Sequence, residues 1–238
     1  MDLVSTGPAV KQAPDGSVEG VVPIAPAPPL ATRKSIQIGR RAFHMANGVV
    51  AATAYALFFT HTQAVYILGT VACLVYFLEQ IRISYPELIR QAPWIERGFL
   101  RAEEQAKESG MIPYAIAILL AIITFPKEAA LIAIYTLALA DPISAIVGIK
   151  FGRRHIVPDK TVEGSFAFFA VTLLVAAGVL TRGTDASHWA VFGASAMIAV
   201  PSALFEMLPL RLDDNLTIPI FVGFIVWMTA AVFGILII

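Results

Sequence analysis

Long apolar runs, separated by short polar segments, recur along this chain from Phe43 to its C-terminus. A helix that crosses a membrane needs about 20 mostly apolar residues, whereas a strand of a membrane barrel alternates in polarity. Because these runs are continuously apolar and lipid offers the backbone no hydrogen bonds, they predict helices. The sequence therefore predicts an all-α, polytopic membrane helix bundle of about seven transmembrane helices, at 43–59, 64–78, 111–125, 129–149, 165–180, 189–208 and 216–238. The second, third and fifth of these runs are short for a span.

The composition supports a membrane protein and excludes some functions. Hydrophobic residues make up 58% of the chain and charged residues only 14%, where a soluble domain has about a quarter charged. The formal net charge is zero, so we expect no general attraction to nucleic acid. The single cysteine, Cys73, excludes an intrachain disulfide and any metal site built from several thiolates.

The first 32 residues differ from the rest of the chain. They are rich in proline, alanine, glycine and valine, without periodicity, and they include a proline-rich run at 23–29. Such a segment buries too little apolar surface to order itself, so 1–32 is predicted to be a flexible N-terminal tail. Asp2 and Asp15 stand where a signal peptide would be basic. Residues 33–238 are then the transmembrane domain.

Lysine and arginine predict how the bundle is oriented. With seven spans, 15 of the 17 basic residues lie on the side that holds the tail, and only Lys127 and Arg182 lie on the other. Loops that stay in the cytoplasm carry this excess of positive charge. The N-terminus is therefore predicted to be cytoplasmic, and the C-terminus to lie outside.

Asp141 lies within the fourth predicted span and is followed by Pro142. A carboxylate in hydrocarbon is costly, by at least about 2.5 kcal/mol, and such residues usually face the bundle interior or a wet cavity. Asp followed by Pro is also a typical helix start, with Asp as the N-cap. Two interpretations remain: a capped kink, or a broken helix that exposes the carboxylate to a cytoplasmic cavity.

A second polar group follows that span. Gly148 and Gly152 permit close backbone approach, Arg153 begins a basic cluster that can meet phosphates, and the segment 160–164 reads KTVEG. A basic loop that anchors to the membrane surface is the simpler alternative. Lys160 and Glu163 also have a structural interpretation, as a snorkelling lysine and a first-turn acid. The chain has no Walker A pattern, so a nucleotide site here is not a P-loop.

Further polar residues lie near other span ends. Glu206 is near the end of the sixth span, and Asp213, Asp214 and Asn215 directly precede the seventh. These oxygen ligands suit Mg²⁺, although Asn215 or Asp214 is also expected to cap the last helix. In the first span His44 follows a pair of arginines, and a lone histidine is more often structural than catalytic. Glu79 and Arg82 are three residues apart, a spacing that permits an ion pair.

The predicted orientation connects these residues. Asp141, Lys160, Glu163, Glu206 and the cluster at 213–215 come from separate segments, yet each falls at the cytoplasmic end of a span. Capping and anchoring do not by themselves predict that convergence. A site that handles a charged, metal-bound cytosolic substrate does.

From about residue 40 to residue 219 the chain resembles the polytopic CTP-dependent lipid kinases: dolichol or polyprenol kinase, phytol kinase and CTP-dependent diacylglycerol kinase. The motifs occur in the family's order. They are RRAFHMANG at 40–48, EQIR at 79–82, RAEE at 101–104, ADPISAIVGIKFG at 140–152, KTVEGSFAFF at 160–169, and Glu206 followed by DDNLTIP at 213–219. The last three are the specific ones. One departure is Ala140, where the family usually has glycine.

The resemblance implies transfer of the γ-phosphate of CTP, or of another nucleotide, to the hydroxyl of a membrane lipid alcohol at the cytoplasmic face. Such a reaction depends on positioning, Mg²⁺ and charge neutralisation. The implied site has a catalytic group, Asp141, Lys160 and Glu163, and a metal group, Asp141, Asp213 and Asp214. The implied nucleotide group is Gly148, Gly152, Arg153, Lys160, Gly164 and Asn215, and further site residues are Arg41, His44, Glu79, Arg82, Glu104 and Glu206.

Two other functions are considered. Phosphatidate cytidylyltransferase, which makes CDP-diacylglycerol, also uses CTP and Mg²⁺ at a membrane face. A transporter also contains broken helices and buried acids, but its site lies at the midplane and needs polar groups on both sides. The predicted outer face here has almost none.

Overall fold

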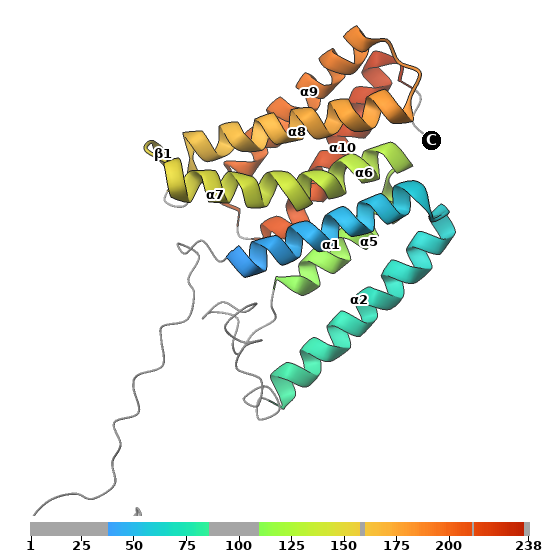
Figure 1. Ribbon diagram of the computed structural model, residues 1–238, viewed down its shortest axis with the longest axis vertical. Coiled ribbons are helices and arrows are strands. Elements are labelled where there is room, and N and C mark those ends of the chain that lie inside the picture. Colours follow the sequence, from blue (N-terminus) through green and yellow to red (C-terminus); the bar gives the residue numbers. More distant parts are fainter. Residues whose placement is uncertain (1–37, 86–109, 158–159, 211, 236–238) are drawn as a thin grey trace, which may run out of the picture.

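The computed structural model describes residues 38–85, 110–157, 160–210 and 212–235, and it is an all-α bundle with one small hairpin (Figure 1). The helices are α1 (Ile38–Leu57), α2 (His61–Ser84), α5 (Met111–Thr124), α6 (Lys127–Tyr135), the π-helical segment η2 (Thr136–Ala140), α7 (Asp141–Phe151), α8 (Val162–Gly183), α9 (His188–Glu206) and α10 (Asp214–Phe233). The strands are β1 (His155–Val157) and β2 (Lys160–Thr161). The site residue Glu104 and the tail at 1–32 lie outside the described residues.

Within the described part of the chain, five helices are long and apolar enough to cross a membrane. They are His61–Ser84, Lys127–Phe151, Val162–Gly183, His188–Glu206 and Asp214–Phe233. The chain is therefore an integral membrane protein by helix length and composition. Two predicted spans do not meet that standard: α5 has 14 residues, and α1 is not among the five. The count of seven and the orientation of the bundle stay predictions.

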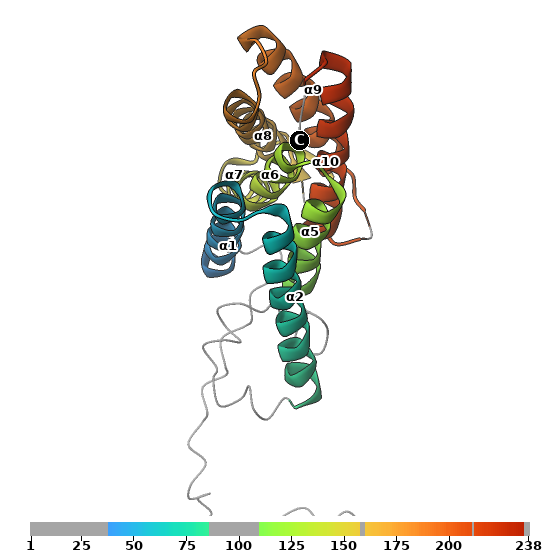
Figure 2. The same cartoon turned by 90° about the vertical axis from the view of Figure 1, so that its right-hand side faces the viewer.

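The centre of the bundle is the helical rod Lys127–Phe151. It contacts α1, α5, α8 and α10, and it lies between α1 and α8 in Figures 1 and 2. The small side chains of Ala129, Ala130 and Ala133 are fully buried on it and let the neighbouring helices approach closely. By contrast, α2 lies at the outside of the bundle, and only 11% of its apolar window is buried.

The central rod passes Asp141 without a break. Asp141 has helical dihedrals, φ −62° and ψ −52°, so the N-cap and the helix break that the sequence allowed at this residue are both wrong. The residues before it form a π-helix, in which the amide of Asp141 donates to the carbonyl of Thr136, five residues earlier. Proline in a regular α-helix clashes with the carbonyl four residues before it. The wider turn accommodates Pro142 and keeps the helix continuous.

The last helix is shorter than predicted. α10 ends at Phe233, whereas the apolar run continues to residue 238. Gly234 has φ 63°, and the amide of Ile235 donates to the carbonyl of Ala230 at 2.9 Å. This is a left-handed C-terminal cap, which glycine adopts readily and which turns the chain away from the helix axis.

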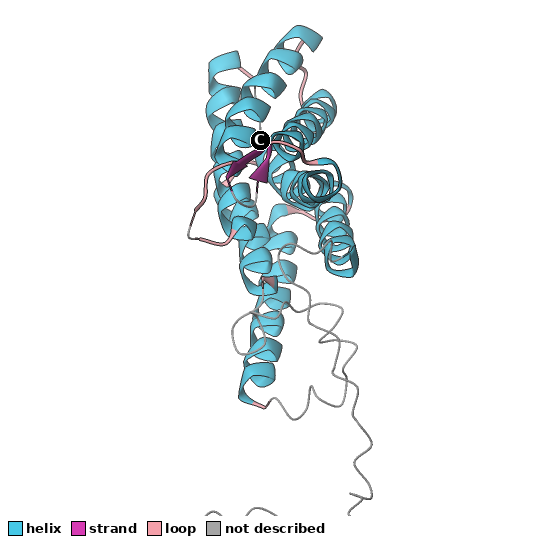
Figure 3. Ribbon diagram, turned by 90° about the vertical axis from the view of Figure 1, so that its left-hand side faces the viewer, coloured by secondary structure: helices cyan, strands magenta, loops and turns pink. Residues whose placement is uncertain are grey.

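A short hairpin connects α7 to α8 (Figure 3). β1 and β2 pair antiparallel, with His155 opposite Thr161 and Val157 opposite Lys160. The hydroxyl of Thr161 then accepts the amide of Gly164 at 3.1 Å and caps α8. The sequence alone predicts a loop over this stretch, whereas the structure pairs it as a hairpin. The pairing fixes the position of Lys160, which lies directly before α8, a helix that packs on α7.

Candidate active site

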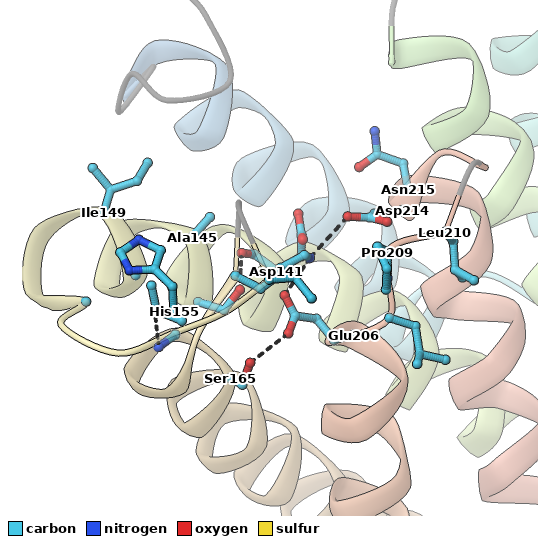
Figure 4. Close-up of a pocket in the computed structure, with 18 of the residues that line it drawn as sticks. Asp141, Ala145, Ile149, His155, Ser165, Glu206, Pro209, Leu210, Asp214 and Asn215 are labelled. Atoms are coloured by element: carbon cyan, nitrogen blue, oxygen red, sulfur yellow. Dashed lines mark hydrogen bonds and ion pairs between the residues drawn. The ribbon is translucent and has the colours of Figure 1, made fainter.

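A cavity of about 880 Å³ opens where α9 ends and where α8 and α10 begin (Figure 4). Its walls come from α1, α7, the hairpin, α8, the α9–α10 connection and the start of α10. Ten residues predicted for the site line this cavity: Arg41, Asp141, Gly148, Gly152, Lys160, Gly164, Glu206, Asp213, Asp214 and Asn215. Segments that are far apart in the sequence therefore meet around one space.

Lys160 is the cation around which the acids of the cavity gather. Its Nζ donates to Oε1 of Glu206 at 2.6 Å and to Oδ2 of Asp214 at 3.2 Å. Burial alone lowers the pKa of Lys160, but the negative charges of Glu206, Asp214 and Asp141 outweigh it and raise the pKa to about 12. The side chain is therefore a permanent cation at physiological pH, and it keeps 20% of its surface exposed to the cavity.

Glu206 is the most deeply buried acid of this group. Its side chain is only 3% exposed, and its second oxygen, Oε2, accepts the hydroxyl of Ser165 at 3.1 Å. Both carboxylate oxygens thus have a partner, one from β2 and one from α8. Since a buried carboxylate needs such partners, Glu206 is held in one orientation and in turn holds Lys160 in the cavity.

Asp141 belongs to the same electrostatic group. It lines the cavity and lies close enough to Lys160, Asp214, Glu206 and Arg41 to interact with their charges. One turn later, Ser144 donates its hydroxyl to the backbone carbonyl of Asp141 at 2.9 Å. The π-helical turn and this hydrogen bond define the backbone from which the carboxylate projects.

The three residues at the start of α10 have different roles. Asp213 is the N-cap, and its Oδ1 accepts the amide of Asn215 at 2.9 Å. The prediction that Asn215 or Asp214 would cap this helix is therefore wrong, because the helix begins at Asp214 itself. Asn215 donates its side-chain amide to the carbonyl of Gly110 at 3.2 Å. Asp214 remains directed to Lys160 and the cavity.

The cavity has donors suited to a divalent cation, but not a complete set. Among the residues that the structure describes, no group of three or more His, Cys, Asp or Glu side chains could hold a metal ion. Mg²⁺ in phosphoryl-transfer sites is usually held by one or two carboxylates together with substrate phosphates and water. Asp141 and Asp214 border the same cavity, so two carboxylates, the number that such sites use, are available there for a divalent cation.

Five other predicted site residues lie outside the cavity lining. Arg153 is exposed, and Oε2 of Glu163 accepts the backbone amide of Arg154 at 3.5 Å. His44 is buried, with its ring edge-on to Tyr114 at 4.5 Å, and its carbonyl accepts the Tyr114 hydroxyl. Glu79 and Arg82 form the ion pair that their spacing permits, at 2.8 Å and buried.

Four polar residues of the cavity were not selected from the sequence: Ser144, His155, Thr161 and Ser165. Two of them had a local signal. Ser144 follows Asp141 by three residues and so lies on the same helical face, and Thr161 precedes a helix with glycine three residues later. The contact of Ser165 with Glu206 joins residues 41 apart, and nothing local predicts it.

The fold and the cavity together define an integral membrane protein with a charged site at one end of its helices. The chain is 24% identical over 202 residues to CTP-dependent diacylglycerol kinase 1 of Schizosaccharomyces pombe. The matched region covers 79% of this chain and 90% of the relative. It is 23% identical over 207 residues to CTP-dependent diacylglycerol kinase 1 of Eremothecium gossypii, covering 77% of this chain and 64% of the relative.

A third relative is an uncharacterised protein of Methanocaldococcus jannaschii, 30% identical over 129 residues, with 53% of this chain and 61% of that protein covered. No protein-family profile and no solved structure matches the chain. The resemblance to CTP-dependent lipid kinases that the motifs indicated is confirmed by the first two relatives.

Proposed function

We propose that this protein is a membrane lipid kinase that transfers the γ-phosphate of CTP to the hydroxyl of a membrane lipid alcohol. The observation that carries the proposal is the cavity in which Lys160 meets Glu206 and Asp214 beside Asp141. A cation with several acids at a membrane face suits a metal-bound triphosphate. The names of two relatives support CTP as the donor and make diacylglycerol the first acceptor to test.

Lys160 is proposed to bind the β- and γ-phosphates. Its raised pKa keeps the charge in place throughout the reaction, and its exposed part faces the cavity. Arg41 also lines this space and adds a second positive charge for the phosphates. Charge neutralisation by positioned cations is the main source of catalysis in phosphoryl transfer, because little covalent chemistry is left to the protein.

Asp141 is proposed to orient the acceptor hydroxyl and to take its proton. The lipid oxygen then forms a bond to the γ-phosphorus, the bond from that phosphorus to the β,γ-bridging oxygen breaks, and CDP leaves with the electron pair. Glu163 was the alternative base, but it does not line the cavity. Asp214 is the proposed Mg²⁺ ligand, and Asp141 keeps its carboxylate for the hydroxyl proton; Mg²⁺, when bound, would supply charge neutralisation at the phosphates.

We also propose that the cavity faces the cytoplasm, where CTP is available. The basic residues Lys150, Arg153 and Arg154 lie close in sequence to its lining, which agrees with the excess of positive charge on cytoplasmic loops.

The test follows labelled atoms from CTP. Purified protein in detergent is incubated with Mg²⁺ and a panel of diacylglycerol, polyprenol and phytol. With γ-labelled CTP we expect label in the lipid and CDP as the soluble product, while α-labelled CTP leaves the lipid unlabelled. Chelation of Mg²⁺ should stop the reaction. Lipid that acquires the α label, with pyrophosphate released, would instead identify a cytidylyltransferase.

A further inference from the structure

Three leucines give the cavity an apolar wall on the α9–α10 connection. Leu208, Leu210 and Leu212 line the cavity, yet their side chains are 48%, 41% and 66% exposed. They alternate along the chain with Pro209 and Arg211. In Figure 4, Leu210 and Pro209 lie beside Glu206 and Asp214, across the cavity from His155 and Ile149. The charged and apolar walls of the cavity therefore adjoin each other.

The position of this connection explains its three leucines. Loops that face water are usually polar, because apolar side chains such as leucine are unfavourable in contact with water. This loop joins two helices that are long and apolar enough to span a membrane, and the last turns of α9 present Leu204 at 58% exposed. The apolar surface of α9 thus continues into Leu208 and the cavity. A surface of this kind is suited to hydrocarbon rather than to water.

We propose that Leu208, Leu210 and Leu212 bind the hydrocarbon of the acceptor lipid, which reaches the cavity sideways from the bilayer past the α9–α10 connection. This inference rests on the proposed kinase function and concerns the same site. The lipid hydroxyl then lies toward Asp141, and the phosphates of the nucleotide lie toward Lys160 and Arg41. The polar substrate and the apolar substrate reach the reacting atoms from different sides.

The kinetic test separates the two substrates. The triple substitution Leu208→Ser, Leu210→Ser, Leu212→Ser is assayed in mixed micelles in which the mole fraction of diacylglycerol is varied. We expect the half-saturating lipid fraction to rise by about tenfold or more, because three serine hydroxyls would face the acyl chain without hydrogen-bond partners. The KM for CTP should change by less than about twofold. A short-chain diacylglycerol, which has little hydrocarbon to bind, should show a smaller difference.

A matched control removes apolar surface elsewhere. Leu57, Phe58 and Trp189 are exposed and do not line the cavity, and they lie where α1 ends and where α9 begins. Their triple replacement by serine should leave both half-saturation values unchanged. An equal loss in this control would mean that the leucines serve general membrane anchoring, and it would overturn the proposal.

A binding measurement distinguishes this inference from the kinase proposal. A diacylglycerol with a diazirine in one acyl chain is photolysed with the protein without CTP, and the labelled peptides are mapped. We expect label on 207–213, and much less after the triple serine substitution or after Leu210→Ser alone. If 207–213 is labelled but the protein shows no phosphoryl transfer in the labelled-CTP assay, the kinase proposal is rejected and the lipid surface is supported. Unchanged labelling and an unchanged lipid dependence in the variants would overturn the lipid surface, whatever the activity.

Discussion

Lys160, Glu206 and Asp214 form a small charged network in which each member has a different exposure. The Glu206 side chain is 3% exposed, that of Lys160 20% and that of Asp214 44%. Loss of a buried partner leaves an uncompensated charge, whereas loss of an exposed one costs little stability. Substitutions of the three residues are therefore expected to lower the stability of the protein by different amounts, although all three residues are proposed to serve the same reaction.

Asp214→Asn tests the chemistry with little effect on folding. We expect turnover to fall by at least about 100-fold, since positioned charges contribute on that order, while the melting temperature in detergent changes little. Asp141→Asn should have the same effect on turnover.

Lys160→Ala should lower both turnover and melting temperature, because Glu206 loses its cation. Arg182→Ala, an exposed residue outside the cavity lining, is the control and should change neither. Normal turnover in Asp141→Asn would remove that residue from the site.

The pKa of Lys160 predicts how stability depends on alkaline pH. Its folded-state pKa, about 12, lies above the ordinary value of 10.5, so the protonated form stabilises the fold. That contribution is complete below about pH 10.5 and is lost as the pH rises through about 12. The melting temperature should therefore show no titration of Lys160 between pH 7 and 9. In Glu206→Gln the alkaline loss should begin at lower pH, and an unchanged profile would mean that the ion pair does not form.

The contact between α7 and α8 depends on glycine. A Cβ on Gly164 would lie 2.9 Å from the carbonyl oxygen of Ser144 and 3.3 Å from the Cα of Gly148. These are backbone atoms, which cannot move aside as a flexible side chain can. The two helices that carry Asp141 and Ser165 are therefore spaced by glycine, and the width of the cavity depends on this spacing.

Gly164→Ala is expected to lower the free energy of unfolding by about 1–3 kcal/mol, as overpacking in a close contact does, and to reduce turnover as well. Thermal unfolding in detergent and the labelled-CTP assay measure the two effects. Gly69→Ala on α2 is the matched control, because a Cβ there has nothing within 4 Å. It should be neutral or slightly stabilising, since alanine favours a helix over glycine by about 1 kcal/mol. Equal behaviour of the two variants would contradict the close contact.

The distribution of basic residues over the whole chain predicts its orientation in the membrane. Reporter fusions after residue 238 should be outside the cytoplasm, and fusions near Lys107 and Lys160 should be inside. Cytoplasmic loops of membrane proteins carry an excess of lysine and arginine, and with seven spans only Lys127 and Arg182 of this chain lie on the other side. A cytoplasmic C-terminus would mean that the number of spans is even. In that case α5, with 14 residues, is the first helix to re-examine.

Local sequence was enough to predict an all-α membrane bundle and the position of most helices, because continuous apolar runs have few alternatives in lipid. It also selected ten residues that surround one cavity, since acids and a lysine at span ends are unusual and matched a family pattern. The contacts of Lys160 with Glu206 and Asp214 join residues 46 and 54 apart. Their partners depend on how α8, α9 and α10 pack, and the sequence pattern contains no such information.

Tertiary structure alone decided the details that give the cavity its chemistry. A π-helical turn precedes Asp141, where the sequence allowed either a capped kink or a broken helix, because a wide turn accommodates Pro142 at lower cost than an interrupted helix in a buried rod. The hairpin places Lys160 at the cavity, whereas Glu163, only three residues later, lies outside its lining. Asp213 rather than its neighbours became the cap. In each case the direction of a side chain depends on the backbone path of one turn, which packing against neighbouring helices selects.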